Sequence, residues 1–316
     1  MSQRQVAVVQ AGSSVFDTPR TLERMRAWCE QAGATGAELV VFPEAYIGGY
    51  PKGLDFGARI GSRSAAGRED FLRYSKAAIT LDGPEVRVVG EFAELMRATL
   101  VTGAIEREGG TLYCSVLCFG PDGRLIGHRR KLVPTASERL VWGSGDGSTL
   151  QAFETPAGRL AAAICWENYM PMLRTSFYAQ SIDIWCAPTV DERDIWQSSM
   201  RHLAYEGRCF VLSACQYLTR DDYPSDFDHI PEAPDGGALI KGGSVIVSPL
   251  GDVLAGPLRG QEGVISATLD LDDIARGKYD LDVTGHYARP DIFTLRVNRA
   301  VQRAVEVDNQ QQPERS

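Results

Sequence analysis

The chain has 316 residues, of which 44% are hydrophobic and 23% are charged, an ordinary composition for a protein with a large buried core. Its 33 Lys and Arg residues against 41 Asp and Glu give a net charge of −8, which argues against nucleic acid and anionic membrane surfaces as partners. No apolar run approaches the roughly 20 residues of a membrane span, and the first residues show no signal-peptide pattern.

The first half of the chain alternates between strand and helix patterns. Short apolar runs typical of strands occur at residues 5–10, 37–42, 100–106, 111–119 and 125–132. Helix-start residues and helical spacing predict one helix that begins near Asp17 and another over residues 85–97. Residues 48–68 contain six glycines among aromatic and apolar residues, which indicates a structured covering loop rather than a linker.

The second half of the chain continues this alternation. Strands are expected over residues 160–164, 182–187, 209–217, 243–248 and 264–269. Helices are expected over residues 173–180 and 200–208, and the polar residues 219–237 are expected to form a long surface excursion. Because the sequence shows no repeat or domain linker, we expect one domain over residues 1–304 and a polar, unstructured tail over residues 305–316.

The seven cysteines are scattered along the chain and include no CxxC pair. Their arrangement argues against a disulfide framework and against a zinc site, and it favours a cytoplasmic protein. Cys114 and Cys118 share one face of a predicted strand, so we interpret them as buried packing residues.

Three side chains that are capable of catalytic chemistry each follow a predicted strand: Glu44, Lys131 and Cys165. If their strands are neighbours that run in the same direction, the three side chains meet at one edge of a sheet. Each residue also has an ordinary interpretation. Glu44 could be a solvated loop residue, Lys131 part of a basic edge, and Cys165 a buried packing residue.

Together the three residues form a complete set for nucleophilic catalysis. A thiol needs a base or a nearby cation to act at neutral pH, and a helix start near Pro171 could help to hold Cys165 as thiolate. A carboxylate can take the thiol proton, and an ammonium group can stabilise the negative charge that develops during attack. No histidine is placed comparably, which argues against a papain-like Cys/His pair.

Three stretches carry a family resemblance: VVFPEAYIGGYPKGLDFG, HRRKLVPTASERLVWGSGDGS and AAAICWENYMPMLR. They resemble the three catalytic motifs of the nitrilase branch of the carbon–nitrogen hydrolases, and the similarity continues to about residue 295. The resemblance implies that Glu44 is the general base, Lys131 the charge stabiliser and proton donor, and Cys165 the nucleophile, with Glu138 as an additional active-site glutamate. It also implies a four-layer αββα sandwich that forms dimers with helices back to back, and in some members longer spiral assemblies.

The candidate pocket residues lie close to these positions. Four aromatic residues within six residues of a catalytic position are expected to form the pocket walls: Tyr50, Trp142, Trp166 and Tyr169. Further substrate-binding candidates are Thr135, Pro188 and Thr189. Ordinary core packing is the alternative for each of them. The Trp-Glu-Asn that follows Cys165 differs from the Tyr-Asp or Phe-Asp typical of similar amidase branches.

The resemblance implies hydrolysis of a nitrile to a carboxylic acid and ammonia through a thioimidate and then a thioester on Cys165. Because every step is proton transfer or acyl chemistry, we expect neither a metal nor an organic cofactor. Two alternatives stay open. One is an amidase or N-carbamoyl amidohydrolase of the same fold, and the other is a non-catalytic assembly protein.

Overall fold

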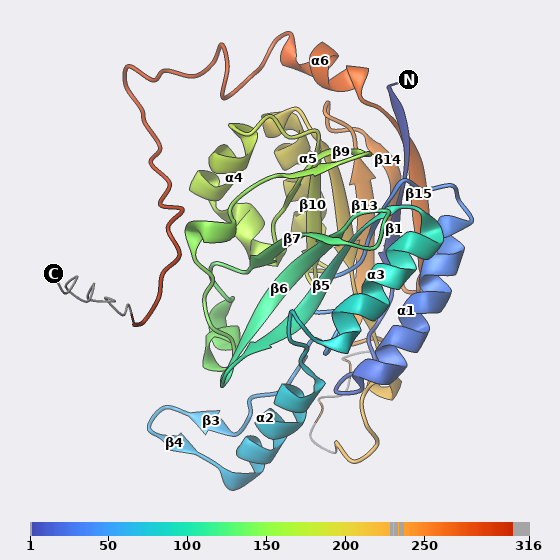
Figure 1. Ribbon diagram of the computed structural model, residues 1–316, viewed down its shortest axis with the longest axis vertical. Helices are drawn as coiled ribbons and strands as arrows, with labels where there is room; N and C mark the ends of the chain where they lie inside the picture. The colour runs from blue at the N-terminus through green and yellow to red at the C-terminus, as the bar shows by residue number, and fades with distance from the viewer. Residues whose placement is uncertain (1, 228–229, 231–232, 234–236, 306–316) are drawn as a thin grey trace, which may run out of the picture.

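The computed structural model describes residues 2–227, 230, 233 and 237–305. These residues form two β-sheets that pack face to face, with helices on the outer face of each sheet (Figure 1). Residues 306–316 of the expected tail lie outside the described part of the chain. The extent of the single domain, residues 1–304, stays a prediction.

The first sheet has the strand order β15-β1-β2-β5-β6-β7. Its strands are β1 (Gln3–Gln10), β2 (Leu39–Val41), β5 (Thr99–Glu108), β6 (Thr111–Phe119), β7 (Leu125–Arg130) and β15 (Gly263–Asp270). The three strands β1, β2 and β5 run parallel, and the remaining neighbours pair antiparallel. Strands β2 and β7 therefore point the same way, with β5 and β6 between them.

The second sheet has the order β12-β13-β11-β10-β9-β8, and β14 pairs with β13. Its strands are β8 (Phe153–Thr155), β9 (Gly158–Ala162), β10 (Ile184–Thr189), β11 (Phe210–Cys215), β12 (Tyr217–Leu218), β13 (Ile240–Val247) and β14 (Val253–Arg259). At its centre β9, β10 and β11 run parallel. Such strands are buried on both faces, which explains their nearly continuous apolar sequences.

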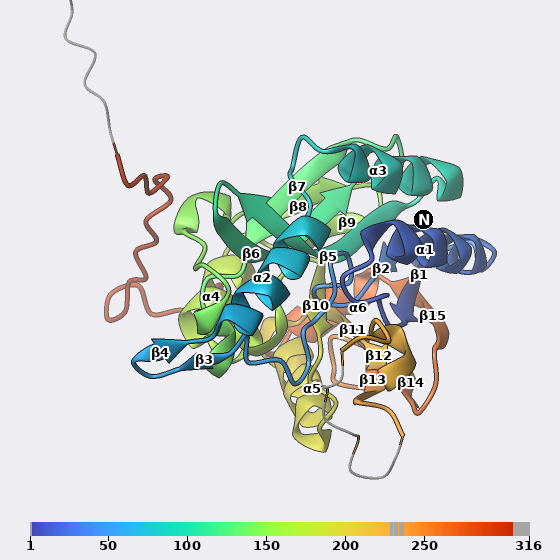
Figure 2. The ribbon, with the colours of Figure 1, turned by 90° about the horizontal axis from the view of Figure 1, so that it is seen from below.

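Helices cover the outer faces of both sheets. The longer helices are α1 (Thr18–Gly33), α2 (Ala65–Ala77), α3 (Pro84–Met96), α4 (Pro171–Tyr178), α5 (Asp194–Gly207) and α6 (Asp272–Lys278). Helices α1 and α3 pack on the first sheet and α4 and α5 on the second, as the view from below shows (Figure 2). In the described residues, no helix has the length and apolar character that crossing a membrane requires.

The short elements lie mostly in the connections. They are a hairpin of β3 (Ala58–Arg59) and β4 (Ser62–Arg63), and the 3₁₀ turns η1 (Ala136–Leu140), η2 (Gly147–Thr149), η3 (Cys165–Tyr169) and η4 (Arg220–Asp222). The β3–β4 hairpin and α2 project together from one end of the molecule (Figure 1). After α6 the chain continues without helix or strand through the last described residue, Val305.

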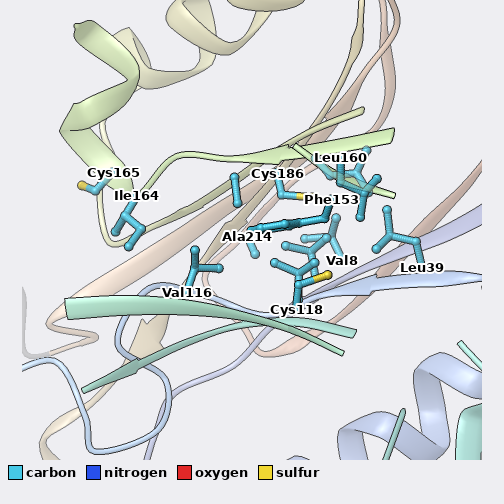
Figure 3. Close-up of a cluster of buried hydrophobic side chains, with 14 of the residues drawn as sticks. Val8, Leu39, Val116, Cys118, Phe153, Leu160, Ile164, Cys165, Cys186 and Ala214 are labelled. Carbon is cyan, nitrogen blue, oxygen red and sulfur yellow. The ribbon is translucent and has the colours of Figure 1, made fainter. Parts of the chain in front are cut away.

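Alternating side chains join these layers. In β1, Val6 and Val8 face the core between the two sheets, whereas Ala7 and Val9 face α1 and α3. Figure 3 shows Val8, Leu39 and Val116 of the first sheet opposite Leu160, Cys186 and Ala214 of the second. The order of layers is therefore helix, sheet, sheet, helix, which confirms the expected αββα sandwich.

Parts of the sequence interpretation were wrong. The described part of residues 219–237 is not simply a surface excursion, because Tyr223 and Phe227 pack with Val15 in a small core of their own. The helix expected over residues 200–208 begins earlier, at Asp194. Helix α2 and strand β14 were not predicted.

Candidate active site

The three strand-end residues lie on two different sheets. Glu44 follows β2 and Lys131 follows β7, both in the first sheet, whereas Cys165 follows β9 in the second. The condition that their strands be neighbours at one sheet edge is therefore not met. A local sequence pattern locates the end of a strand but does not encode the sheet to which the strand belongs, because strand pairing is non-local. The site consequently lies between the two sheets.

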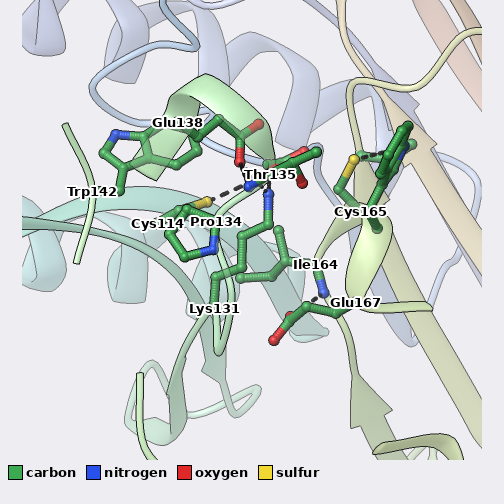
Figure 4. A network of polar contacts seen from close by, with 12 residues as sticks. Cys114, Lys131, Pro134, Thr135, Glu138, Trp142, Ile164, Cys165 and Glu167 are labelled. Atoms are coloured by element: carbon green, nitrogen blue, oxygen red, sulfur yellow. Dashed lines mark hydrogen bonds and ion pairs between the residues drawn. The ribbon is translucent and has the colours of Figure 1, made fainter. Parts of the chain in front are cut away.

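Lys131 connects two glutamates (Figure 4). Its Nζ donates to Glu44 Oε1 at 2.7 Å and to Glu138 Oε2 at 2.8 Å. The side chains of Lys131 and Glu44 are fully buried, and that of Glu138 is 11% exposed. Turn η1 fixes Glu138, since the backbone N–H of Thr135 donates to Glu138 Oε2 at 2.6 Å and the Tyr50 hydroxyl donates to Oε1 at 2.9 Å.

Burial and neighbouring charges tune the two central groups. Burial raises the pKa of Glu44 to about 7, with Lys131 lowering it and the negative charge of Glu138 raising it further. Although burial alone lowers the pKa of Lys131, the negative charges of Glu44 and Glu138 raise it well above its ordinary value. Lys131 therefore keeps its positive charge at neutral pH, whereas Glu44 is poised to exchange a proton there.

Cys165 lies at a strained corner between β9 and the turn η3. Its backbone φ is 50°, in the left-handed region that non-glycine residues rarely adopt. The hydroxyl of Thr189, at the end of β10, donates to the Cys165 sulfur at 3.2 Å. Burial and the charge of Glu44 raise the pKa of the thiol, and Lys131 opposes them only in part. A thiol with a raised pKa needs a base to act as a nucleophile at neutral pH. The contribution of the helix start at Pro171 stays a prediction.

A cavity of about 420 Å³ lies beside this cluster. Glu138 lines it together with Tyr50 and Trp142, two of the predicted pocket residues. The centroids of these two rings lie 5.9 Å apart in an edge-to-face arrangement. The Trp142 indole N–H donates to the Tyr74 hydroxyl at 3.1 Å. These contacts fix the aromatic wall of the cavity.

The other predicted pocket residues have different surroundings. Trp166 is 42% exposed, and its indole N–H donates to Asp191 at 2.9 Å. The ring of Tyr169 contacts those of Trp166 and Trp196, and Tyr169 is not among the residues that line the 420 Å³ cavity. Pro188 is buried beside Thr189 in β10. A role in substrate binding stays a prediction for all of the predicted pocket residues.

A model of the family described as carbon-nitrogen hydrolase matches residues 5–279 of the chain. The chain belongs to the carbon-nitrogen hydrolase family. It is 53% identical over 294 residues to a bifunctional nitrilase/nitrile hydratase of Lupinus angustifolius, covering 91% of this chain and 84% of that protein. It is 51% identical over 306 residues to an aliphatic nitrilase of Sinorhizobium fredii, covering 96% and 99% of the two chains.

Among solved structures, the NitFhit protein of C. elegans superposes with a TM-score of 0.73 at 19% identity, covering 96% of this chain and 69% of that one. At this identity the likeness is one of fold. The sequence relatives confirm the resemblance to the nitrilase branch of the carbon-nitrogen hydrolases that the three motifs indicated.

Sequence reasoning missed several residues around the site of this carbon-nitrogen hydrolase. Cys114 was interpreted as packing, but its thiol lies 3.7 Å from Glu44 Oε1. The side-chain amide of Gln216 donates to the backbone carbonyl of Glu44 at 2.7 Å. Arg129 and Glu167 lie inside two of the motifs, yet nothing in either motif alone indicates that they pair. Only the register of β6 beside β7 could have placed Cys114 near Lys131.

Proposed function

We propose that the chain is a nitrilase that hydrolyses an organic nitrile to the carboxylic acid and ammonia, with Cys165 as the nucleophile. The observation that carries the proposal is the buried set of Glu44, Lys131 and Cys165, assembled from two sheets beside a cavity. Sequence identities above 50% to proteins named as nitrilases support the substrate class.

The first half of the reaction forms a covalent intermediate. The Cys165 sulfur attacks the nitrile carbon while its proton passes to Glu44, whose Oε2 accepts no hydrogen bond from the described residues. One carbon–nitrogen π bond breaks, and Lys131 stabilises the charge on the nitrogen and gives it a proton. Glu44 then returns a proton to Lys131 across their 2.7 Å contact. The product is a neutral thioimidate on Cys165.

The second half consumes two water molecules. Glu44 takes a proton from the first water as its oxygen adds to the thioimidate carbon, and Glu44 passes this proton to the nitrogen. The nitrogen then receives the proton of the new hydroxyl, the carbon–nitrogen bond breaks and ammonia leaves, so that a thioester remains. Glu44 activates the second water in the same way, the carbon–sulfur bond breaks to release the acid, and the proton held by Glu44 restores the thiol. Atoms balance as R–C≡N plus two waters giving R–COOH plus ammonia.

A second product is proposed from the same intermediate. If the tetrahedral adduct expels the Cys165 sulfur instead of ammonia, the product is the amide. The Lupinus angustifolius relative, named a bifunctional nitrilase/nitrile hydratase, favours this branch. We therefore expect some amide beside the acid, and chromatography of the products of one nitrile measures both.

Replacement of the thiol tests the proposal. Cys165→Ala is expected to abolish ammonia release from a panel of aliphatic and aryl nitriles while the circular dichroism spectrum is retained, because the sulfur on which the proposed thioimidate forms is then absent. Cys118→Ala, which removes a buried thiol from the same inter-sheet core, is the matched control and should lower stability by about 1–3 kcal/mol with turnover retained.

The same panel separates the alternatives. Each nitrile is assayed beside its amide, and an amidase or N-carbamoyl amidohydrolase would release ammonia from the amide or carbamoyl compound far faster than from the nitrile. A non-catalytic assembly protein would release none from either. Turnover in folded Cys165→Ala protein would contradict the mechanism.

Assembly and location complete the proposal. We infer a homodimer, with longer spirals as an extension, because large apolar side chains of α4, α5 and the turn after β13 are exposed: Met172, Ile195, Tyr205 and Leu250.

A cytoplasmic location is supported by the cysteines. All seven lie among the described residues, and each is a free, buried thiol, as expected in a reducing compartment.

A further inference from the structure

We propose that Arg129 and Glu167 form a positioning pair that fixes the corner carrying Cys165 relative to the segment carrying Lys131. The proposal rests on the roles given to Cys165 and Lys131 above. Both side chains are fully buried and hydrogen-bond to backbone groups next to Cys165 and Lys131, so the pair is expected to act through the backbone of the two segments.

The pair crosses the interface between the sheets. Arg129 is in β7 of the first sheet, two residues before Lys131, and Glu167 is in turn η3, two residues after Cys165. Arg129 Nη1 donates to Glu167 Oε1 at 3.0 Å, and Nη2 donates to Oε2. Both side chains are fully buried. This fork of two parallel hydrogen bonds is the geometry in which arginine holds a carboxylate most rigidly.

Each oxygen of Glu167 also accepts a backbone N–H from one of the two catalytic segments. Oε1 accepts from Leu132, the residue after Lys131, at 2.6 Å, and Oε2 accepts from Ile164, the residue before Cys165, at 2.9 Å. Figure 4 shows the Glu167 carboxylate beside Ile164, below the Lys131 side chain. One carboxylate thus binds the backbone next to Lys131 and the backbone next to Cys165.

The arginine adds a third connection. Its Nε donates to the carbonyl of Ala162, the last residue of β9, at 2.9 Å. The strand before Cys165 and the turn after it are therefore both attached to β7. A strained backbone such as that of Cys165 persists only where its surroundings over-determine it, and these contacts supply part of that constraint.

Stability alone is a weak explanation for the pair. A buried ion pair loses so much hydration that apolar residues of similar volume often stabilise a protein equally well. What apolar residues cannot do is accept two backbone N–H groups from two segments at once. That property is what the geometry between Cys165 and Lys131 requires.

The decisive variant is Glu167→Gln. A glutamine has one acceptor oxygen, so its NH₂ group must face either the N–H of Leu132 or that of Ile164, and one segment is released. Small displacements of reacting groups reduce rates by roughly 10²-fold. We expect kcat to fall on the order of 10²-fold with KM nearly unchanged, because the cavity residues stay in place. Arg129→Lys keeps the carboxylate and should lower kcat less.

Glu262→Gln is the matched control. Glu262 also accepts a hydrogen bond from an arginine, Arg24 at 2.7 Å, and from a backbone N–H, that of Gly12 at 2.9 Å. Among the described residues, neither of these hydrogen bonds involves a segment that carries a proposed catalytic residue. Glu262→Gln should lower the melting temperature without changing kcat. Mass spectrometry of enzyme quenched during turnover should show slower formation of the Cys165 adduct in Glu167→Gln only.

The outcomes are separable. Unchanged kcat in folded Glu167→Gln, or an equal loss of kcat in Glu262→Gln, would overturn the positioning role. If Glu167→Gln does not fold, Arg129→Lys decides, and an unaltered kcat in that variant overturns the role as well. Turnover in Cys165→Ala would instead overturn the proposed site itself, whatever the pair does.

Discussion

Three of the eight non-glycine residues with a left-handed backbone in the described part of the chain carry or adjoin the proposed chemistry. Ala45, Ala136 and Cys165 all have left-handed φ values, between 46° and 50°. Ala45 follows Glu44, and Ala136 opens the turn that holds Glu138. Each such residue costs of order 1–3 kcal/mol and persists where packing and hydrogen bonds enforce it. Strain at these positions is consistent with a site that is held in place before substrate arrives.

The pH dependence of kcat/KM should distinguish the roles of Glu44 and Glu138. Glu44 must be deprotonated to accept the thiol proton, so kcat/KM is expected to rise with pH around a midpoint near 7, the pKa of Glu44. Because the negative charge of Glu138 raises that pKa, Glu138→Gln should move the midpoint to lower pH, in addition to lowering the rate.

The exposed Glu108→Gln is the control for this shift and should leave the midpoint in place. The measurement is kcat/KM between about pH 5 and 9. A midpoint that does not move in Glu138→Gln would show that Glu44 is not the group that titrates.

At the scale of elements, the two sheets approach one another closely where β7 meets β8. A Cβ at Gly127 in β7 would lie 2.5 Å from the ring of Phe153 in β8. Gly127→Ala should therefore overpack the inter-sheet core and lower the free energy of unfolding by about 1–3 kcal/mol. A second substitution, Phe153→Leu, should recover part of this loss, as measured by urea unfolding of the single and double variants.

The effects of Gly127→Ala and Phe153→Leu on the free energy of unfolding should not be additive. Phe153→Leu alone should destabilise the protein, whereas in the Gly127→Ala background it should stabilise it. Losses that simply add in the double variant would mean that the two residues do not press on one another.

The sequence predicted the elements that show a clear run or stripe of buried apolar residues. It did not predict elements that bury few side chains. Strands β1, β5 and β6 were found because their apolar runs end in glycine turns or polar residues. Helix α2 was missed because it buries only Gly67, Tyr74 and Ala77, too few residues for a clear apolar stripe. Strand β14 was missed because its side chains are exposed or half-buried, so no buried face marks it.

The candidate site shows the same division. Positions after strands, together with the family resemblance, made Glu44, Lys131 and Cys165 the candidate catalytic residues, and the resemblance added Glu138. The meeting of two sheets at the site, and the pairing of Arg129 with Glu167, depend on contacts between residues far apart in the chain. Such contacts leave no periodic signal in a single sequence.

At the scale of the whole molecule, the exposed apolar side chains of α4 and α5 predict a self-association surface. We expect light scattering to give at least a dimeric mass for the unmodified chain. Met172→Glu combined with Tyr205→Glu should yield monomers, because two like charges per subunit would then face each other across a symmetric interface.

Leu95→Glu provides the control for this surface. Leu95 is exposed to a similar degree but lies on α3, on the outer face of the first sheet. This variant should keep the mass of the unmodified chain. A monomeric mass for the unmodified chain at working concentration would contradict the proposal.

The pairing of the first strand with the last has a consequence for synthesis on the ribosome. All four proposed catalytic residues are translated by residue 165, but β1 pairs antiparallel with β15, so that Gln3 lies opposite Asp270. The sheet that carries Glu44 and Lys131 therefore lacks an edge strand until nearly the whole chain has been translated. A nascent chain stalled at residue 250 is expected to release no ammonia from nitriles. Translation would thus delay the reactive thiol of Cys165 until its surroundings are complete.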